Sequence, residues 1–486
     1  NKNYLFEFEH FMLKKLTDAV NQHIIDVKNI EPLSQERYRQ AEFKSTFTDS
    51  FVGRIAELAE IFTYIDGSSE QPFVINGTAG QGKTALIAKA ASEAEKCSSY
   101  ITCNKFIGAS STSSHTRMML ESLIQELALN NCLQVPEEYE AENDNFYSQI
   151  QTLLKKISIP TVIFIDGLDK LHNENFLQWL PIQLPTTLKV VISLLSTNRI
   201  THYSALLLSK IDDSNHINLT AFDVEEALSC LKIWLKSIQR TLSKEQFEYV
   251  IKVFAKSDGS PLYLRFVFEE VKHWQSNHWQ LNLPNNLFSA IDSFRENLTS
   301  KHYHNQNVVK YIFGLIISSK SGLTEKEIID LLSDNSFLLD EIEGFSSLAV
   351  IIDGVSAKRF PIAVWLRILE QIRPFLYEYE SNGHLLLTLS NEAIKETLKQ
   401  KVYDDNKLAL HSALIKYFTG NQTERSYVEL PWNLFKIDNN ERLADFLSDI
   451  DNYLAFIKNN QQEDIIVYLN YLAKGDVFFI KIVEKY

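Results

Sequence analysis

A glycine-rich stretch at residues 77–84 carries the clearest chemical signature in this sequence. It follows the spacing G-x-x-x-x-G-K-[ST], with Gly77, Thr78, Ala79, Gly80, Gln81, Gly82, Lys83 and Thr84. Glycine permits backbone conformations that turn successive N–H groups inward around phosphate oxygens. In this motif the lysine reaches the β- and γ-phosphates, and the last hydroxyl binds Mg²⁺. The stretch therefore predicts a site for ATP or ADP with Mg²⁺, in which Thr84 is a metal ligand.

Two acids follow an apolar segment further along the chain. Residues 161–165 are apolar or β-branched, Asp166 ends the run, and Asp169 lies just beyond it. The carboxyl ends of parallel strands meet at one edge of a sheet, where phosphates also bind. We predict that Asp166 holds Mg²⁺ through water and that Asp169 polarises the attacking water.

A cation follows the next apolar segment. Residues 190–195 predict another buried strand, and Asn198 and Arg199 lie shortly after it. Either side chain would then lie near the γ-phosphate, where the positive charge of Arg199 senses or stabilises the phosphate charge. An arginine in a solvated loop fits the same pattern equally well.

These residues lie among alternating strand and helix signals. Apolar runs predict strands at residues 73–76, 100–108, 161–166, 189–195 and 216–219. Amphipathic stretches predict helices at residues 83–96, 116–129, 145–156 and 173–180. Strands that alternate with helices indicate a parallel sheet covered by helices on both faces.

Helical patterns dominate the rest of the chain. Residues 1–45 and 401–486 have apolar residues at helical spacing, and residues 221–240 form a clear apolar stripe. Thr324 and Glu327 have the spacing of a capping box at the start of a helix. Segments 375–379 and 385–389 flank Ser381-Asn-Gly and predict a hairpin.

Composition narrows the functional classes. The 486 residues include 48 Lys+Arg and 62 Asp+Glu, giving a net charge of −14, which argues against a nucleic-acid partner. Four cysteines without a CxxC pair favour a reducing compartment, and no apolar run is long enough to span a membrane. We therefore expect a cytoplasmic chain. Because it begins without Met and stops within an apolar stretch, we interpret it as a piece of a longer protein.

With these motifs in place, the sequence resembles the STAND class of P-loop ATPases, the signal-transduction relatives of NACHT and NB-ARC domains. Its hhGRxxE element, which packs on adenine in the family, is matched by Phe51, Val52, Gly53, Arg54 and Glu57. Asp166-Gly-Leu-Asp169 is similar to the Walker B signature. Lys170 stands where many NACHT proteins have an acid, so we expect slow ATP hydrolysis.

The resemblance extends over residues 45–435. Gly259-Ser-Pro261 is similar to the GxP element of the helical lid, whose proline contacts nucleotide, and residues 322–332 are similar to the winged helix. Asn391 replaces a histidine that often contacts the β-phosphate of ADP. Residues 106–114 and 429–432 look most like the nephrocystin and telomerase-associated-protein branch and its bacterial relatives.

The resemblance implies an α/β P-loop NTPase domain followed by a helical lid, a winged helix and α-helical segments. The predicted domains are a helical linker (1–45), the nucleotide-binding domain (46–219), the lid (220–300), the winged helix (301–400) and a helical connector (401–486). It further implies an ATP/ADP-dependent signalling switch, plausible in immunity or antiviral defence. A trigger protein would bind a C-terminal repeat sensor, and the oligomer would activate an N-terminal effector, both outside this sequence.

Two other functions fit parts of the pattern. An AAA+-type DNA loader or remodeller also combines a phosphate loop, a helical lid and a winged helix, but the acidity and the GxP element count against it. A nucleotide-bound scaffold that does not hydrolyse ATP is compatible with Lys170 and Asn391.

Overall fold

A computed structural model describes most of the chain. The described residues are 15, 31–48, 51–110, 112–130, 133–136, 139, 143–171, 177–196, 208–275, 282–343, 349–352, 355–381, 383–458 and 462–473. They fall into two compact units. The first comprises Asn1–Asn76 and Lys83–Asn218, and the second comprises Gly77–Gly82 and Leu219–Tyr486.

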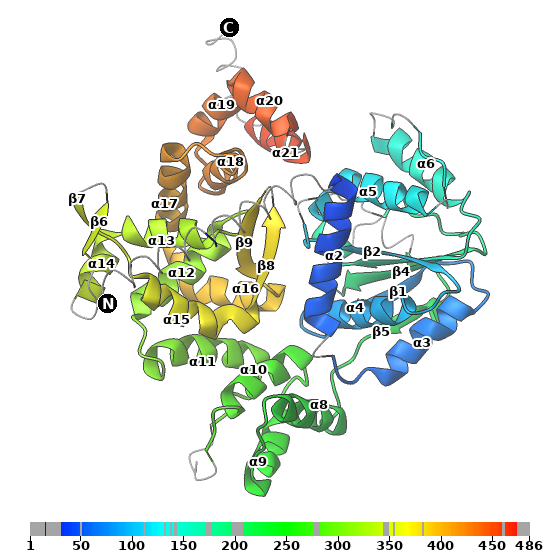
Figure 1. Cartoon of the computed structure of the whole chain (residues 1–486), viewed down its shortest axis with the longest axis horizontal. Helices are drawn as coiled ribbons and strands as arrows, with labels where there is room; N and C mark the ends of the chain where they lie inside the picture. Colours follow the sequence, from blue (N-terminus) through cyan, green and yellow to red (C-terminus); the bar gives the residue numbers. More distant parts are fainter. Residues whose placement is uncertain are drawn as a thin grey trace. The chain divides into compact units, whose positions relative to one another are not determined.

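A parallel sheet forms the centre of the first unit (Figure 1). Its strands are β1 (Phe73–Gly77), β2 (Ile101–Phe106), β3 (Thr161–Asp166), β4 (Leu188–Leu195) and β5 (His216–Asn218). Their order is β2-β3-β4-β1-β5, and the registers of β2 with β3, β3 with β4 and β1 with β5 are parallel. The predicted parallel sheet is confirmed, and β4 separates the strand before the glycine loop from the strand that ends in Asp166.

Helices cover both faces of this sheet. They are α2 (Pro32–Thr48), α3 (Ile55–Asp66), α4 (Lys83–Ala94), α5 (Thr116–Leu129) and α6 (Asn143–Leu154). Successive strand side chains point to opposite faces. Ile163 and Ile165 pack in one apolar cluster with residues of α5 and α6, whereas α4 contacts β2, β3 and β4. Both faces of β3 are therefore buried, as its continuous apolar run predicts.

Helix α2 packs on this unit through polar side chains. Gln40 accepts a hydrogen bond from the backbone N–H of Phe106 at 2.7 Å, and Glu36 accepts one from the Ser110 hydroxyl at 2.8 Å. Lys44 forms an ion pair with Glu95 of the chain after α4. The helical pattern predicted for residues 1–45 is confirmed from Pro32 onward, where α2 continues to Thr48, whereas nearly all of residues 1–30 lie outside the described residues.

The predicted helix at residues 173–180 is wrong over its described part. Residues 172–176 lie outside the described residues, and residues 177–180 form a turn. Pro181 follows directly, and a proline disfavours the helical conformation of the residue before it. The apolar side chains of this turn are nevertheless buried in the core: Leu177, Trp179 and Leu180. The apolar pattern therefore predicted their burial correctly, but it did not predict their secondary structure.

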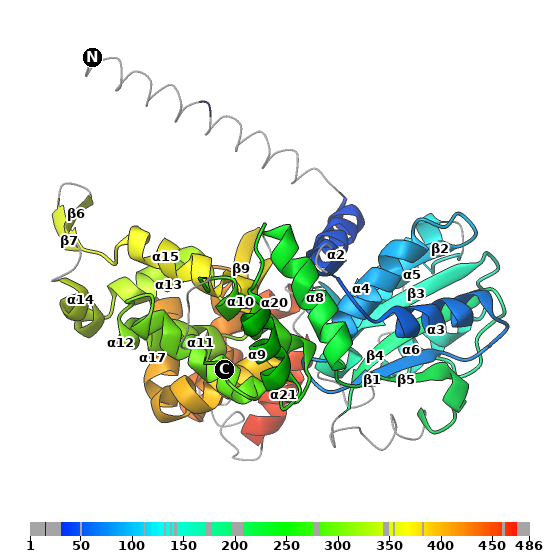
Figure 2. The same ribbon diagram turned by 90° about the horizontal axis from the view of Figure 1, so that it is seen from below.

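Helices dominate the second unit (Figure 2). The first group is α8 (Val224–Ser237), α9 (Lys244–Phe254), α10 (Pro261–Val271) and α11 (Leu287–Ser300). The next is α12 (Gln306–Ser318), α13 (Glu325–Ser333), α14 (Ser336–Glu343), α15 (Ile362–Ile372) and α16 (Glu392–Leu398). A π-helical segment, Lys399–Tyr403, then leads to α17 (Lys407–Gly420), α18 (Ser426–Lys436), α19 (Asn440–Ser448), α20 (Ile450–Lys458) and α21 (Gln462–Ala473).

Two hairpins interrupt these helices. The predicted one is confirmed as β8 (Leu376–Ser381) paired with β9 (His384–Leu389), and Leu387 also bridges to Leu323 before α13. The predicted capping box of Thr324 and Glu327 is present at the start of α13. The other hairpin, β6 (Ala349–Ile352) with β7 (Val355–Lys358), was not predicted, although Asp353-Gly354 between its strands is a typical turn pair. The winged-helix interpretation of this region stays a prediction.

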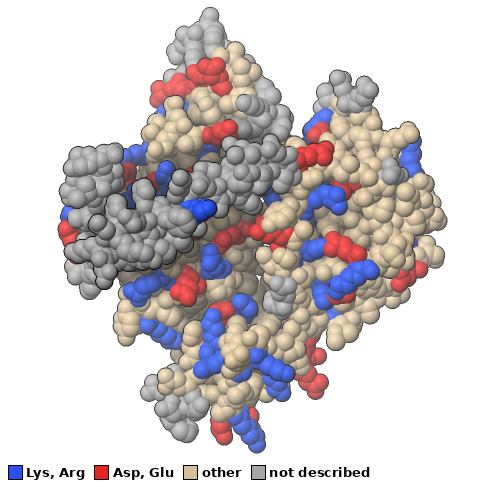
Figure 3. Space-filling view, viewed as in Figure 1, with Lys and Arg blue, Asp and Glu red and all other residues tan. Residues whose placement is uncertain are grey.

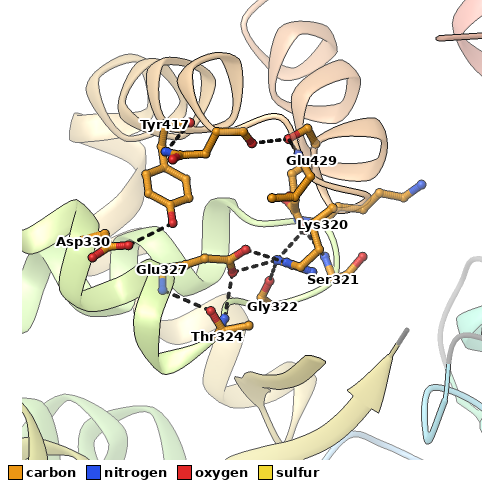
Figure 4. Close-up of polar contacts among 12 residues, drawn as sticks. Lys320, Ser321, Gly322, Thr324, Glu327, Asp330, Tyr417 and Glu429 are labelled. Atoms are coloured by element: carbon orange, nitrogen blue, oxygen red, sulfur yellow. Dashed lines mark hydrogen bonds and ion pairs between the residues drawn. The ribbon is translucent and has the colours of Figure 1, made fainter. Parts of the chain in front are cut away.

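A buried ionic cluster joins α18 to the turn between α12 and α13 (Figure 4). Arg425 donates to both carboxylate oxygens of Glu327, at 2.6 and 3.1 Å, and to the carbonyl of Gly322 at 2.7 Å. Glu429, one helical turn further, accepts the backbone N–H groups of Lys320 and Ser321 at 2.8 and 2.9 Å.

These charges are almost fully removed from solvent. Arg425 and Glu327 are 6% exposed, and Glu429 is 0% exposed. Burial lowers the pKa of Arg425, but the carboxylates of Glu429 and Glu327 outweigh it, so the guanidinium is held firmly in its charged form. Each buried charge thus meets an opposite charge or backbone donors, as burial of ions requires.

Candidate functional site

Asp166 lies at the end of β3 with both carboxylate oxygens held by hydroxyl groups. Thr84, in the first turn of α4, donates to Oδ2 at 2.7 Å. Ser193, on the neighbouring strand β4, donates to Oδ1 at 2.6 Å. Asp166 is only 1% exposed. The structure therefore brings together the two predicted metal ligands, Thr84 and Asp166.

Asp169 lies on a short 3-10 turn, Leu168–Lys170, just beyond β3. Its carboxylate accepts the backbone N–H of Leu195, at the end of β4, at 2.9 Å. Burial raises the pKa of this carboxyl, while Lys170 and Lys83 act in the opposite direction. Because much of the Asp169 side chain still meets solvent, the net shift is modest in energetic terms.

Lys170 folds back along the same turn. Gly167 has φ of +76°, and a Cβ atom placed on it would lie 3.0 Å from Lys170 Cε. The ammonium group donates to the backbone carbonyl of Ile107 at 3.4 Å. Glycine is therefore favoured at position 167 for two reasons: its positive φ, and the aliphatic part of the Lys170 side chain, which leaves little room for a Cβ atom.

Lys83 is half-buried at the start of α4. Burial lowers the pKa of its ammonium group, and the charges of Asp169 and Asp166 partly offset that effect. The lysine and both acids therefore sense one another's charge. The ammonium group of Lys83, in these surroundings, can bind phosphate oxygens as a point charge.

The glycine loop 77–82 belongs to the second unit and contacts the start of α10. The carbonyl of Gly80 accepts the N–H of Leu262 at 3.2 Å and the hydroxyl of Ser260 at 3.3 Å. Ser260 caps α10, and Pro261 is its first residue. Gly80 and Gly82 have φ of +85° and +84°, which glycine adopts without strain. The predicted GxP element and the predicted phosphate loop are thus in direct contact.

Other predicted site residues precede α3 and α16. Phe51 and Val52 are half-buried in the chain before α3, Gly53 has φ of +85°, and Arg54 precedes the helix, 3% exposed and paired with Glu57 at 2.7 Å. Asn391 caps α16 by accepting the N–H of Ala393 at 2.9 Å. Arg199 lies outside the described residues.

Ser193 is the site residue that sequence reasoning missed. It is completely buried and contacts Asp166 directly. The signal was present, because Ser193 is a polar residue inside an otherwise apolar strand, and a buried hydroxyl needs hydrogen-bond partners. Its partner could not be named, because the order of β3 and β4 in the sheet is not a local property of the sequence.

Thr84 and Asp166 fit a magnesium ion. In phosphate-binding sites Mg²⁺ keeps several waters and is held by one or two protein oxygens together with phosphate oxygens. A hydroxyl and a carboxylate in contact supply two oxygen ligands of that kind. The part of the chain that the structure describes holds no helix long and apolar enough to cross a bilayer.

Several known proteins are similar in sequence to this chain. Residues 55–199 match the family described as Nephrocystin 3, N-terminal. The chain is 24% identical over 406 residues to NACHT domain- and WD repeat-containing protein 1 of Homo sapiens, covering 80% of this chain and 25% of that protein. It is 25% identical over 449 residues to human NACHT and WD repeat domain-containing protein 2, covering 86% and 25%. This chain is a NACHT/STAND-like P-loop NTPase.

The NACHT/STAND-like chain spans about a quarter of the length of these curated relatives. Among solved structures, the Aeropyrum pernix ORC1 protein in complex with DNA gives a TM-score of 0.36 at 13% identity, covering 76% of this chain and 98% of that one. At this TM-score the likeness adds nothing to the assignment.

Proposed function

We propose that this NACHT/STAND-like chain is an ATP/ADP-dependent switch. Residues 77–84 would bind the phosphates, with Lys83 on the β- and γ-phosphates and Thr84 and Asp166 holding Mg²⁺. Mg²⁺ would neutralise phosphate charge when bound. Asp169 would polarise the attacking water, and Arg199 would contact the γ-phosphate.

The observation that carries this proposal is the contact between Thr84 and Asp166. Thr84 lies on helix α4 and Asp166 at the end of strand β3, and their side-chain oxygens lie 2.7 Å apart. Two neutral hydroxyls hold this buried carboxylate, and carboxylate and hydroxyl oxygens are the kind of ligand that Mg²⁺ takes from a protein. Lys83 lies within electrostatic reach of both acids.

The second part of the proposal concerns the change of state. Gly80 of the glycine loop is hydrogen-bonded to the start of α10, the predicted lid helix. A nucleotide that binds this loop differently in two arrangements of the lid shifts the balance between them. ADP would favour a closed monomer, and ATP with a trigger protein would favour an oligomer.

Pro261 and the Phe51–Arg54 element would contact the nucleotide, whereas Asn391 is already used as a helix cap.

The partners of the switch are proposed from the relatives. The two human relatives carry WD repeats by name, which supports a repeat sensor for the trigger in a longer protein, with an effector at the opposite end and a role in immune or antiviral signalling. Lysine and arginine are interspersed with acidic side chains on the coloured surface of both units in Figure 3. Together with the net charge of −14, this supports protein rather than nucleic-acid partners.

The decisive experiment measures nucleotide binding by calorimetry with ATP and ADP in Mg²⁺ buffer. Lys83→Ala removes a charge-assisted contact with phosphate and is expected to weaken binding by about 10- to 100-fold. Lys89→Ala is the matched control, because Lys89 lies on the same helix and forms a partly exposed ion pair with Glu93 at 2.8 Å. That variant should bind within about twofold of wild type.

Oligomeric state is measured on the same samples by mass photometry. A wild-type chain that binds neither nucleotide, or a Lys83→Ala variant that binds like Lys89→Ala, would overturn the proposal. Tight binding to DNA at roughly physiological salt would favour the AAA+-type alternative instead.

A further inference from the structure

Strand β4 holds both acids of the candidate site. The Ser193 hydroxyl donates to Asp166 Oδ1 at 2.6 Å, and the backbone N–H of Leu195 donates to Asp169 Oδ1 at 2.9 Å. Side chains two residues apart on a strand lie on the same face. One strand thus fixes the position of both carboxylates, although neither acid belongs to it.

The hydroxyl group of Ser193 has one acceptor for its proton among the described residues. The backbone N–H of Gly167 donates to Ser193 Oγ at 2.8 Å, so the oxygen already accepts a hydrogen bond. A hydroxyl has a single proton to donate, and the only acceptor that the structure places at hydrogen-bond distance from it among the described residues is Asp166 Oδ1. Ser193 is 0% exposed and Asp166 is 1% exposed, so bulk water does not compete.

The length of this contact is typical of a hydroxyl bonded to an ionised carboxylate. With Oδ1 held by Ser193, the carboxylate cannot rotate freely, and Oδ2 stays within 2.7 Å of Thr84 Oγ1. The parallel register pairs Ile165 with Ile192, which places Asp166 and Ser193 at neighbouring positions of two adjacent strands. The orientation is therefore built into the sheet.

We propose that Ser193 is a positioning residue for the divalent cation, which orients Asp166 so that its Oδ2 and the Thr84 hydroxyl meet the same Mg²⁺ ion. This inference rests on the proposed nucleotide site. Ser193 does not itself touch the ion or the nucleotide. Its contribution appears as the gain in nucleotide affinity that Mg²⁺ provides.

The test measures ADP affinity by calorimetry in Mg²⁺ and in EDTA, and the ratio of the two dissociation constants reports the gain from Mg²⁺. The informative pair is Ser193→Thr and Ser193→Val, because these side chains have the same shape and differ by one hydroxyl. Losing a hydrogen bond to a charged group predicts a ratio about tenfold lower for Ser193→Val than for Ser193→Thr. Affinity in EDTA should agree within about twofold.

Ser318→Ala controls for the loss of a buried hydroxyl elsewhere, since Ser318 is 1% exposed and its hydroxyl donates to the Gly314 carbonyl of its own helix. It should leave the ratio unchanged. Equal ratios for Ser193→Thr and Ser193→Val overturn the inference, as does an equal loss of affinity in Mg²⁺ and EDTA, which marks a purely structural role. A wild type that binds no ADP, or gains nothing from Mg²⁺, instead removes the proposed function itself.

Discussion

Asp166 and Glu429 are both carboxylates buried in the core, but their surroundings differ in kind. Asp166 in the first unit is held by two neutral hydroxyls. Glu429 in the second unit accepts two backbone N–H groups and lies 3.6 Å from the guanidinium of Arg425. Asp166 has neutral hydrogen-bond donors and lies within electrostatic reach of Lys83. Glu429 belongs to a buried cluster that contains its own cation.

This difference separates a binding group from a structural one. A self-compensated cluster needs no ligand, and its removal costs folding free energy because a charge is left buried without its partner. Under the proposed function, Asp166 instead gains a counter-charge when a cation binds, which lowers the cost of burying its carboxylate. Mutations at the two acids should therefore have opposite consequences, one mainly for stability and the other mainly for ligand affinity.

The largest expected effect comes from breaking the structural cluster. Arg425→Met leaves Glu327 and Glu429 buried without their cation and should lower the free energy of unfolding by about 3–5 kcal/mol. Hydrogen exchange should also accelerate at the amides of Lys320 and Ser321, which bond to Glu429. Lys416→Met is the control, because its ion pair with Asp334 is exposed (74% and 59%) and should contribute under about 1 kcal/mol. Equal stability of the two variants would contradict the structural role of the cluster.

Asp166→Asn should have the reverse profile. The amide keeps an oxygen for the Ser193 hydroxyl but loses the charge that attracts Mg²⁺, so the gain in nucleotide affinity from Mg²⁺ should fall by more than about tenfold. The melting temperature, followed by scanning fluorimetry without nucleotide, should change little or rise. If this variant unfolded like Arg425→Met and retained its gain from Mg²⁺, the contrast between the two acids would be lost.

The smallest expected effect concerns Asp169. Because the pKa of this carboxyl is raised in the folded chain, its ionisation destabilises the fold as pH rises from the ordinary carboxyl range to above the raised pKa. Asp169→Asn should therefore be more stable than wild type at neutral pH, by less than about 1 kcal/mol given its solvent exposure. The advantage should disappear as pH falls to about 3 or below, where the carboxyl is mostly protonated in both the folded and the unfolded wild type. Unfolding in urea at several pH values measures the difference in stability between this variant and wild type. A difference that stays the same at every pH would exclude the ionisation of Asp169 as its cause.

Local patterns in the sequence predicted much of the fold and part of the site. The glycine loop has fixed spacing, β3 is a continuous apolar run, and the capping box of Thr324 and Glu327 spans a single helical turn. The contact of Ser193 with Asp166 required the strand order. Arg425 and Glu327 lie 98 residues apart, so their pairing also depends on the tertiary fold. Conversely, Pro181 explains why the apolar residues before it form a buried turn instead of the predicted helix.

The polar packing of α2 has a consequence for how that helix can move. Glu36, Gln40 and Lys44 succeed one another at intervals of one turn, and each has a particular partner on the unit. Apolar surfaces tolerate sliding, but hydrogen bonds require their distances, so a shift of α2 by one turn, about 5.4 Å, would break these contacts together. Gln40 also bonds to Phe106, whose register partner on β3 is Asp166. These contacts therefore fix the register and rotation of α2 on the sheet, next to the strand end that carries Asp166.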